Sequence, residues 1–264
     1  MFPLRDNIPY VTFPVVNYAV IGICSIVFLL QLGDEADGRS VMVEQFGMIP
    51  AFISKPDQPV AIVERYEEDG QIVQKEREII PAVNPWITLV TCVFLHGGWL
   101  HFLGNMWFLH IFGDNVEDRL GHLGYIVFYL FCGVMASVAH LATNYGSPIP
   151  TIGASGAIAG VMGAYLVLYP HSKVTSVIPL LGFIQILIVP APIFLGVWFL
   201  LQFVQGAASI TTVQTTGVAW WAHVGGFFAG AVIAGLLRGV GQTNPAVQQR
   251  RPGTDHVGIY RPYR

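Results

Sequence analysis

The stretch Gly153-Ala154-Ser155-Gly156 lies where a polar, proline-containing turn (residues 144–150) becomes an apolar segment. The segment Ser155–Tyr169 has about 15 residues before Pro170, so as a helix it rises only about 22 Å. The hydrocarbon core of a bilayer is about 30 Å thick. If Lys173 marks one membrane face, Ser155 lies below the other face, at the start of a helix that does not complete the span. Irregular backbone at that depth needs protein or a water-filled cavity beside it. The pattern therefore predicts a buried serine in a wet site.

The composition is typical of a membrane protein. Of the 264 residues, 53% are hydrophobic and 11% are charged, and the mean hydropathy is +0.58. Soluble domains carry about 25% charged residues, so we predict a multi-pass protein in a lipid bilayer and expect no nucleic-acid partner. The three cysteines, Cys24, Cys92 and Cys132, have no CxxC spacing and lie in or beside apolar stretches. We interpret them as small hydrophobic residues and expect no disulfide framework, no metal and no other cofactor.

Polar segments divide the chain into four predicted parts. Residues 1–32 hold a short lead and an uncleaved first transmembrane helix, whose apolar run is long for a signal peptide. Residues 33–85 form an extracytoplasmic loop with eleven of the sixteen acidic residues. Within this loop, Asp69-Gly70 between two strand-length segments suggests a charged β-hairpin at 62–78, with a solvated loop as the alternative. The core follows at 86–238, and residues 239–264 form a disordered, basic cytoplasmic tail.

The apolar segments predict an all-α membrane protein, a bundle of six transmembrane helices with a soluble first loop. The expected helices are Val15–Leu32, Trp99–Asp114, His122–Thr143, Ser155–Tyr169, Ile193–Gln205 and Trp220–Leu237, with an interfacial piece at Val174–Val189. With six spans, the basic residues outside residues 33–85 fall on one side, so both termini are expected to be cytoplasmic.

Four polar side chains share one predicted depth. Counted from the basic residues that mark the inner face, Ser155, His223 and Asn105 each lie roughly 21 to 22 Å into the membrane. His101 is one turn from Asn105 on the same helix face. Taken singly, the serine reads as a helix-packing contact, the histidine as a satisfied interior residue, and the His101 and Asn105 pair as a link between helices. Their coincidence in depth favours a functional site, because polar groups at such depth are costly.

The residue types indicate acyl-transfer chemistry. A neutral His223 can take the proton of Ser155 as the hydroxyl attacks a peptide carbonyl, and can return it to the leaving amine. No Asp or Glu occurs between Arg119 and Thr254, so we predict a Ser-His dyad without a carboxylate. Asn105, His101 and the backbone N–H of Ser155 are the candidate donors to the oxyanion.

Glycines flank the two predicted catalytic residues. Gly156 and Gly160 follow the serine, and Gly226 and Gly230 follow the histidine, each pair at GxxxG spacing. Small faces of this kind let two helices approach closely. We therefore expect these four glycines, with Gly153 before the serine, to pack the helices around the site.

In combination and order, the motifs resemble the rhomboid family of intramembrane serine proteases. They are His96-Gly97-Gly98-Trp99-Leu100-His101 followed by Asn105, Glu117-Asp118-Arg119-Leu120-Gly121, Gly153-Ala154-Ser155-Gly156, and Ala222-His223 followed by Gly226 and Gly230. The resemblance covers residues 94–237 and implies a water-accessible six-helix bundle that cleaves transmembrane segments of single-span or polytopic membrane proteins.

The resemblance also implies a role for each matching residue. It makes Ser155 the nucleophile, His223 the base, and His101 with Asn105 the oxyanion stabilisers. It suggests the fifth helix as a substrate gate, with residues 206–217 as a cap. The chain departs from the family at two places. Trp86 is followed by Ile87 rather than arginine, and Ala159 stands where some members stack an aromatic ring on the catalytic histidine.

Two other functions remain as alternatives. One is a catalytically inactive rhomboid-like protein that binds transmembrane helices, although such proteins usually lack the serine or the histidine. The other is a transporter with a broken fourth helix, which predicts an inverted repeat that the sequence does not display. The lack of a recognisable transit peptide favours a bacterial cytoplasmic membrane.

Overall fold

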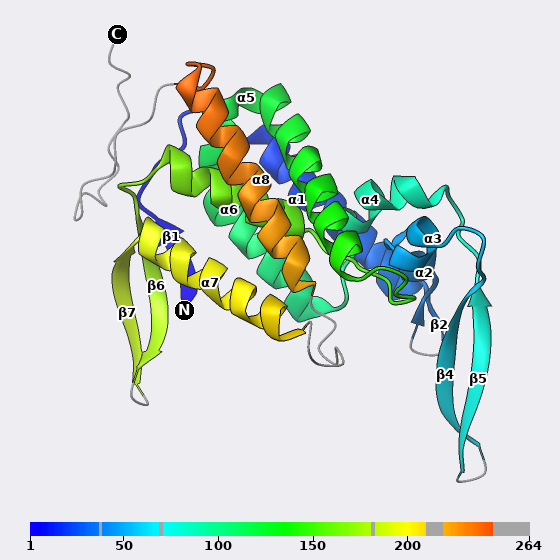
Figure 1. Ribbon diagram of the computed structural model, residues 1–264. Helices are drawn as coiled ribbons and strands as arrows, with labels where there is room; N and C mark the ends of the chain where they lie inside the picture. The colour runs from blue at the N-terminus through cyan, green and yellow to red at the C-terminus, as the bar shows by residue number, and fades with distance from the viewer. Residues whose placement is uncertain (37–38, 69–70, 181–182, 210–218, 245–264) are drawn as a thin grey trace.

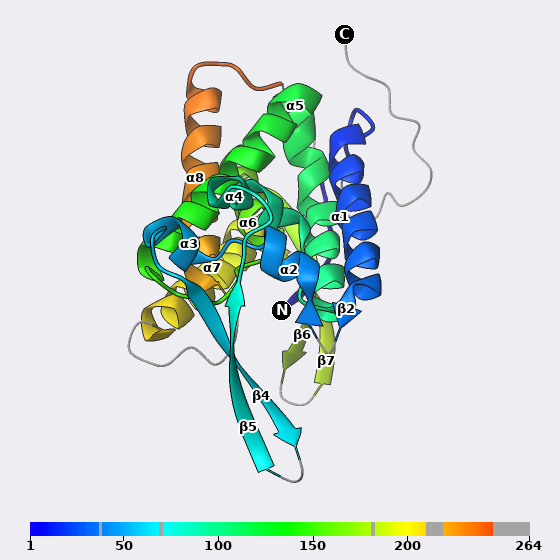
Figure 2. The same cartoon turned by 90° about the vertical axis from the view of Figure 1, so that its right-hand side faces the viewer.

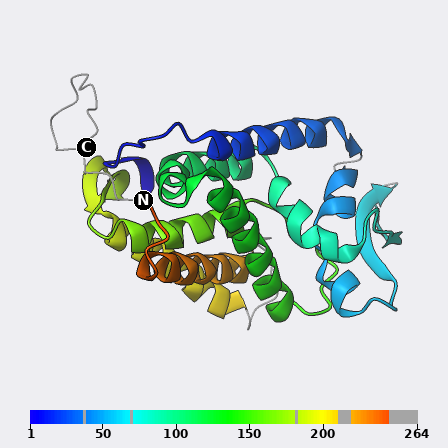
Figure 3. The same ribbon diagram turned by 90° about the horizontal axis from the view of Figure 1, so that it is seen from above.

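A computed structural model describes residues 1–36, 39–68, 71–180, 183–209 and 219–244. The chain is mostly helical, and in the described part four helices are long and apolar enough to cross a membrane. These are α1 (Val15–Gly33), α5 (Trp99–Thr143), α7 (Ala191–Ser209) and α8 (Trp220–Gly239), with the shorter α6 (Ser155–Leu168) between them (Figure 1). Seen from above, α1 and α8 lie on opposite sides of α5 (Figure 3).

Helix α5 is longer than the sequence predicts. It runs for 45 residues and is broken only at Gly121, whose φ of 71° and ψ of 164° lie outside the helical region. Glycine adopts positive φ without steric cost, so the bend falls on this residue. The predicted end of the second helix at Asp114 is therefore wrong, because residues 115–120 continue the helix as far as the bend.

A side chain of α5 that precedes the bend caps the N-terminus of α1. Pro14 precedes α1 and provides no side-chain cap. Instead, the Glu117 carboxylate accepts hydrogen bonds from the backbone N–H groups of Val16 (3.0 Å) and Asn17 (2.7 Å). Negative charge at a helix N-terminus satisfies the unpaired N–H groups and complements the helix dipole. Glu117, which lies beyond the predicted end of the second helix, thus fixes the start of the first helix.

Helix α6 forms the centre of the bundle. Every residue from Gly156 to Tyr165 is buried, and the helix packs against α5 and α8. Its glycines face small residues: a Cβ on Gly156 would lie 2.5 Å from Cβ of Ala136, and one on Gly160 would lie 2.5 Å from Cβ of Cys132. Because these distances are shorter than van der Waals contact, only glycine fits at either position.

The chain is mostly helical, as predicted, but it also forms small sheets. The predicted interfacial piece Val174–Val189 is a β-hairpin of β6 (Lys173–Leu180) and β7 (Phe183–Pro190). The N-terminal strand β1 (Phe2–Asp6) pairs antiparallel with β6, giving the strand order β1-β6-β7. The segment is rich in β-branched Val, Ile and Thr, which favour strands, and Pro170 and Pro190 separate it from the helices on either side.

The segment between α1 and α5 carries short elements and a second hairpin. They are β2 (Glu35–Ala36), β3 (Arg39–Ser40), α2 (Val41–Phe46), α3 (Pro50–Ser54), β4 (Val60–Glu68), β5 (Gln71–Ile79), the 3-10 turns η1 (Pro85–Ile87) and η2 (Cys92–Phe94), and α4 (Thr88–Thr91). The β4-β5 hairpin projects away from the helices (Figure 2). Of the predicted tail, residues 245–264 lie outside the described residues, and so do residues 210–217 of the predicted cap.

Candidate active site

Ser155 is the first residue of α6 and follows a tightly held loop. The loop is paired to residue 48, since Thr151 and Met48 exchange backbone hydrogen bonds of 2.8 and 3.0 Å. Gly153 has a φ of +123°, and a Cβ there would lie 2.7 Å from the ring of His101. Both the backbone conformation and the lack of space require glycine. The sequence Gly153-Ala154-Ser155 thus places the serine hydroxyl beside α5 at the N-terminus of the central helix.

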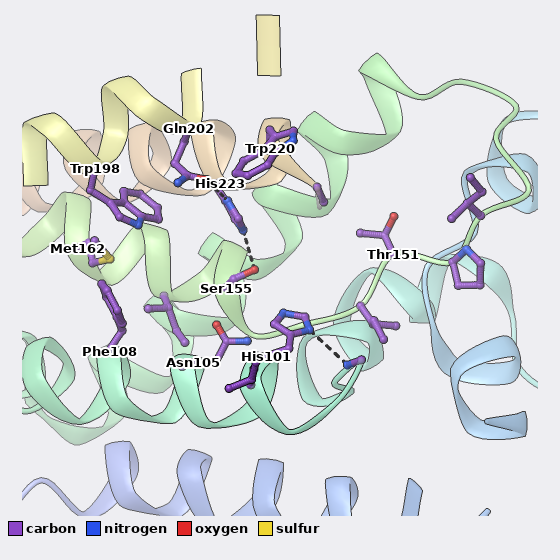
Figure 4. Close-up of a pocket in the computed structure, with 18 residues that line it drawn as sticks. His101, Asn105, Phe108, Thr151, Ser155, Met162, Trp198, Gln202, Trp220 and His223 are labelled. Carbon is purple, nitrogen blue, oxygen red and sulfur yellow. Dashed lines mark hydrogen bonds between the residues drawn. The ribbon is translucent and has the colours of Figure 1, made fainter. Parts of the chain in front are cut away.

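His223 lies on the first turn of α8 and meets Ser155 directly. Its Nε2 atom is 2.8 Å from Oγ of Ser155 (Figure 4). The contact depends on close packing of α6 and α8: a Cβ on Gly226 would overlap the carbonyl of Gly156, and one on Gly230 would overlap that of Gly160. The structure therefore brings the two predicted residues together, and the predicted glycines lie where the helices touch.

Gln202 of α7 forms a hydrogen bond with the second ring nitrogen of His223. Its Oε1 atom is 2.6 Å from Nδ1 of His223. An amide oxygen only accepts, so Nδ1 carries the proton and Nε2 presents its lone pair to the serine hydroxyl. Gln202 was not predicted, because only a carboxylate was considered as the partner of His223. Gln202 and Gln205 are the two glutamines in the apolar run of α7, and polar residues in such a run were the available signal.

Two tryptophans flank the same imidazole. The ring of Trp198 lies with its centroid 5.9 Å from that of His223, and the ring of Trp220 lies edge-on at 6.1 Å. Neither tryptophan was predicted to lie at the site. Together they surround the histidine with aromatic rings, although Ala159 is not aromatic.

His101 and Asn105 lie on the first turns of α5 and face the serine across a cavity (Figure 4). Nδ1 of His101 accepts a hydrogen bond of 3.2 Å from the backbone N–H of Gly97, so the ring proton of a neutral imidazole is on Nε2. Within the described part of the chain, Nδ2 of Asn105 is buried without a hydrogen-bond partner. Both residues line the same cavity as Ser155, and each carries an N–H group without a hydrogen-bond partner among the described residues.

The cavity in front of these residues has a volume of about 670 Å³. Its polar residues include the serine, the two histidines, Asn105 and Gln202, and its walls include the apolar side chains of Phe108, Met162 and Trp198. A few convergent polar groups within apolar walls are typical of a site that binds a substrate.

A second buried histidine supports the site from behind. Burial lowers the pKa of His96 to about 4, so this imidazole is neutral near pH 7. Its backbone is clamped by Gln31 of α1, which donates Nε2–H to the carbonyl of His96 (3.1 Å) and accepts from its N–H (2.9 Å). The ring of His96 packs edge-on against that of His101, with centroids 5.4 Å apart. Helix α1 thus fixes the loop that leads into the first turn of α5.

The fold and the site define an integral, multi-pass membrane protein with a hydrogen-bonded serine and histidine in a cavity between its helices. The chain belongs to the rhomboid family, since the Rhomboid domain model matches residues 83–239. The predicted resemblance is therefore confirmed.

Similar proteins come from bacteria and from organelles. Rhomboid protease GluP of Bacillus subtilis is 38% identical over 35% of this chain and 17% of its own length. Rhomboid-like protein 11, chloroplastic, of Arabidopsis thaliana is 31% identical over 58% of this chain and 52% of its own length. Rhomboid protein 1, mitochondrial, of Saccharomyces cerevisiae is 26% identical over 64% of this chain and 45% of its own length. The chain thus matches about half or less of each relative. These relatives do not support the expected assignment to a bacterial cytoplasmic membrane.

Proposed function

We propose that this protein is an intramembrane serine endopeptidase that cleaves transmembrane segments of membrane-protein substrates through a Ser155–His223 dyad. The observation that carries the proposal is the 2.8 Å contact between Oγ of Ser155 and Nε2 of His223 inside a cavity of the helix bundle. Two residues that are far apart in the sequence meet there with the orientation that proton transfer requires.

The reaction begins when Ser155 attacks the carbonyl carbon of a peptide bond bound in the cavity. As the O–C bond forms, the hydroxyl proton passes to Nε2 of His223. The tetrahedral intermediate then collapses, the C–N bond breaks, and His223 gives the proton to the leaving amine. A water molecule from the cavity, deprotonated by the same Nε2, hydrolyses the acyl-enzyme. Ser155 is thereby regenerated with its proton.

The negative oxygen of the tetrahedral intermediate needs hydrogen-bond donors. Nε2–H of His101 is a candidate donor, because the Gly97 N–H bonds to Nδ1 and leaves the ring proton on Nε2. Nδ2–H of Asn105 is a second candidate, because it has no hydrogen-bond partner within the described residues. The backbone N–H of Ser155 is among the N-terminal amides of α6 that lack an intrahelical partner. Removing one donor of this kind typically costs about 10² to 10³ in kcat.

We also propose six membrane crossings with both termini in the cytoplasm. Gly121 divides α5 into two parts of about 22 residues, each about 33 Å long, which is enough to span the hydrocarbon core. Arg119 and Arg238 both donate hydrogen bonds to carbonyls at the C-terminal end of α6, at Leu168 and Val167. These basic residues gather at one end of the bundle, opposite Ser155, as the positive-inside rule expects of the cytoplasmic face.

The proposal is tested with purified protein and a model single-span substrate in detergent, together with labelling by a fluorophosphonate. We expect Ser155→Ala and His223→Ala to lower cleavage by about 10⁴-fold or more and to abolish labelling. Ser25→Ala is the matched control, since among the described residues the Ser25 hydroxyl bonds only to the carbonyl of Ile21 within α1. Its cleavage and labelling should equal those of the wild type.

Two outcomes would overturn the proposal. Cleavage that survives in Ser155→Ala would show that the nucleophile is another residue. A folded wild-type protein that retains transmembrane peptides but neither cleaves nor labels would instead support the helix-binding alternative.

A further inference from the structure

We propose that Gln202 is a positioning residue that fixes the tautomer and orientation of His223, so that the docked position of α7 is part of the active state. This inference rests on the proposed function. It extends the dyad to a hydrogen-bonded chain from Gln202 through His223 to Ser155, contributed by α7, α8 and α6 in turn.

The geometry of the chain is continuous. His223 donates Nδ1–H to Oε1 of Gln202 at 2.6 Å, and Ser155 donates its hydroxyl to Nε2 at 2.8 Å. A free neutral imidazole exchanges between two tautomers, of which only the Nδ1–H form can accept the serine proton at Nε2. The amide oxygen selects that form before substrate arrives.

An amide suits this position better than a carboxylate does. His223 is buried at membrane depth, where a permanent charge on its partner would be costly. A neutral oxygen avoids that cost in the resting enzyme, yet its dipole still favours the imidazolium that forms during the reaction. This arrangement explains how the histidine can be oriented although no acidic residue lies between Arg119 and Thr254.

One face of α7 makes all of these contacts. Trp198, Gln202 and Gly206 are spaced four residues apart, so they lie on the same side of the helix. Trp198 packs against the His223 ring, and a Cβ on Gly206 would lie 3.3 Å from Cβ of Trp220 at the start of α8. The opposite face is apolar and exposed, with Leu200 and Leu201 among its residues. A movement of α7 away from α8 would therefore remove both the contact of Trp198 with the His223 ring and the hydrogen bond that selects its tautomer.

The test compares Gln202→Leu and Gln202→Glu with the wild type, with Leu201→Ala as the control on the exposed face of α7. Gln202→Leu keeps the approximate volume and removes the acceptor, so we expect kcat to fall about 10- to 100-fold while KM changes less than about 2-fold. Gln202→Glu restores an acceptor but places a charge beside the buried ring, so its kcat should lie between those of Gln202→Leu and the wild type. Leu201→Ala should leave both constants unchanged.

A spectroscopic readout separates positioning from a merely structural role. In protein labelled with 15N-histidine, with His223→Ala used for assignment, the His223 signal should be that of one tautomer, protonated at Nδ1. Gln202→Leu should convert it to a mixture. Wild-type kinetics in Gln202→Leu, or an unchanged signal in that variant, would overturn the inference while leaving the dyad intact. A wild-type enzyme that does not cleave, with Ser155 unlabelled, would instead overturn the proposed function on which the inference rests.

Discussion

Gly230 lies on α8 two turns beyond His223, where α8 crosses α6. A Cβ at this position would lie 2.5 Å from the carbonyl carbon of Gly160 and 2.7 Å from its Cα, and closer still to its oxygen. The obstructing atoms are backbone, so no side-chain rotation can relieve the contact. The variant Gly230→Ala must therefore move the two helices apart.

The required displacement can be worked out from these distances. Carbon atoms pack at about 3.5 Å, so α8 must retreat from α6 by about 1 Å. The 2.8 Å hydrogen bond between Ser155 and His223 spans the same interface. A misplacement of about 1 Å in a catalytic pair can cost about 10²-fold in rate. Overpacking also costs about 1 to 3 kcal/mol of stability, partly offset by the better helix propensity of alanine, about 1 kcal/mol.

The assay is cleavage of a single-span substrate, with thermal unfolding measured on the same preparations. Gly235→Ala is the matched control, because it lies on the same helix and a Cβ there meets nothing within 4 Å. We expect kcat of Gly230→Ala to fall about 100-fold, and that of Gly235→Ala to stay at the wild-type value. Equal activity of both variants would refute the link between helix separation and catalysis. A loss in Gly235→Ala as large as that in Gly230→Ala would refute it as well.

Two further predictions follow from other contacts. Gly153→Ala places a side chain on a residue with positive φ, within 2.7 Å of the His101 ring. Cleavage and fluorophosphonate labelling should therefore both fall by about 10-fold or more, and wild-type rates would contradict the tight fit. Glu117→Ala removes two hydrogen bonds from the start of α1. Thermal unfolding in detergent should therefore show a loss of about 3 kcal/mol in the free energy of unfolding, while cleavage per folded molecule stays unchanged. An unchanged melting temperature would contradict the capping role.

Much of the site was predictable from the sequence, because helical rise converts position into depth. Ser155 and His223 were placed at one level by counting from basic residues, and the structure joins them by a hydrogen bond. The glycine spacing predicted the close approach of α6 and α8, which the overlap at Gly226 and Gly230 requires. These features depend on short-range periodicity within single helices.

The features that escaped prediction depend on packing between segments. Gln202 reaches His223 only because α7 packs beside α8, and nothing within α7 itself indicates that neighbour. The hairpin of β6 and β7 was predicted as an interfacial piece, since its apolar sequence is compatible with a helix or a strand. The pairing with β1, which is distant in the sequence, completes the sheet. The predicted second helix ended too early, at Asp114, where a cluster of charged residues begins. In the structure the helix continues past this cluster, and one member of it, Glu117, caps α1.

The absence of an aromatic ring at Ala159 has a physical reason in the packing of α6. Ala159 is fully buried in a helix whose glycines already touch Ala136 and Cys132 of α5. A large ring in this tightly packed helix would require its neighbours to separate, which would break the α6–α8 contact that the dyad needs. The aromatic support for His223 comes instead from Trp198 on α7. The proposed nucleophile is thus held by the buried central helix, whereas the proposed base contacts a peripheral helix whose outer face is exposed. The proposed cleavage activity should therefore respond more strongly to changes in how α7 packs than to changes elsewhere on the lipid-facing surface.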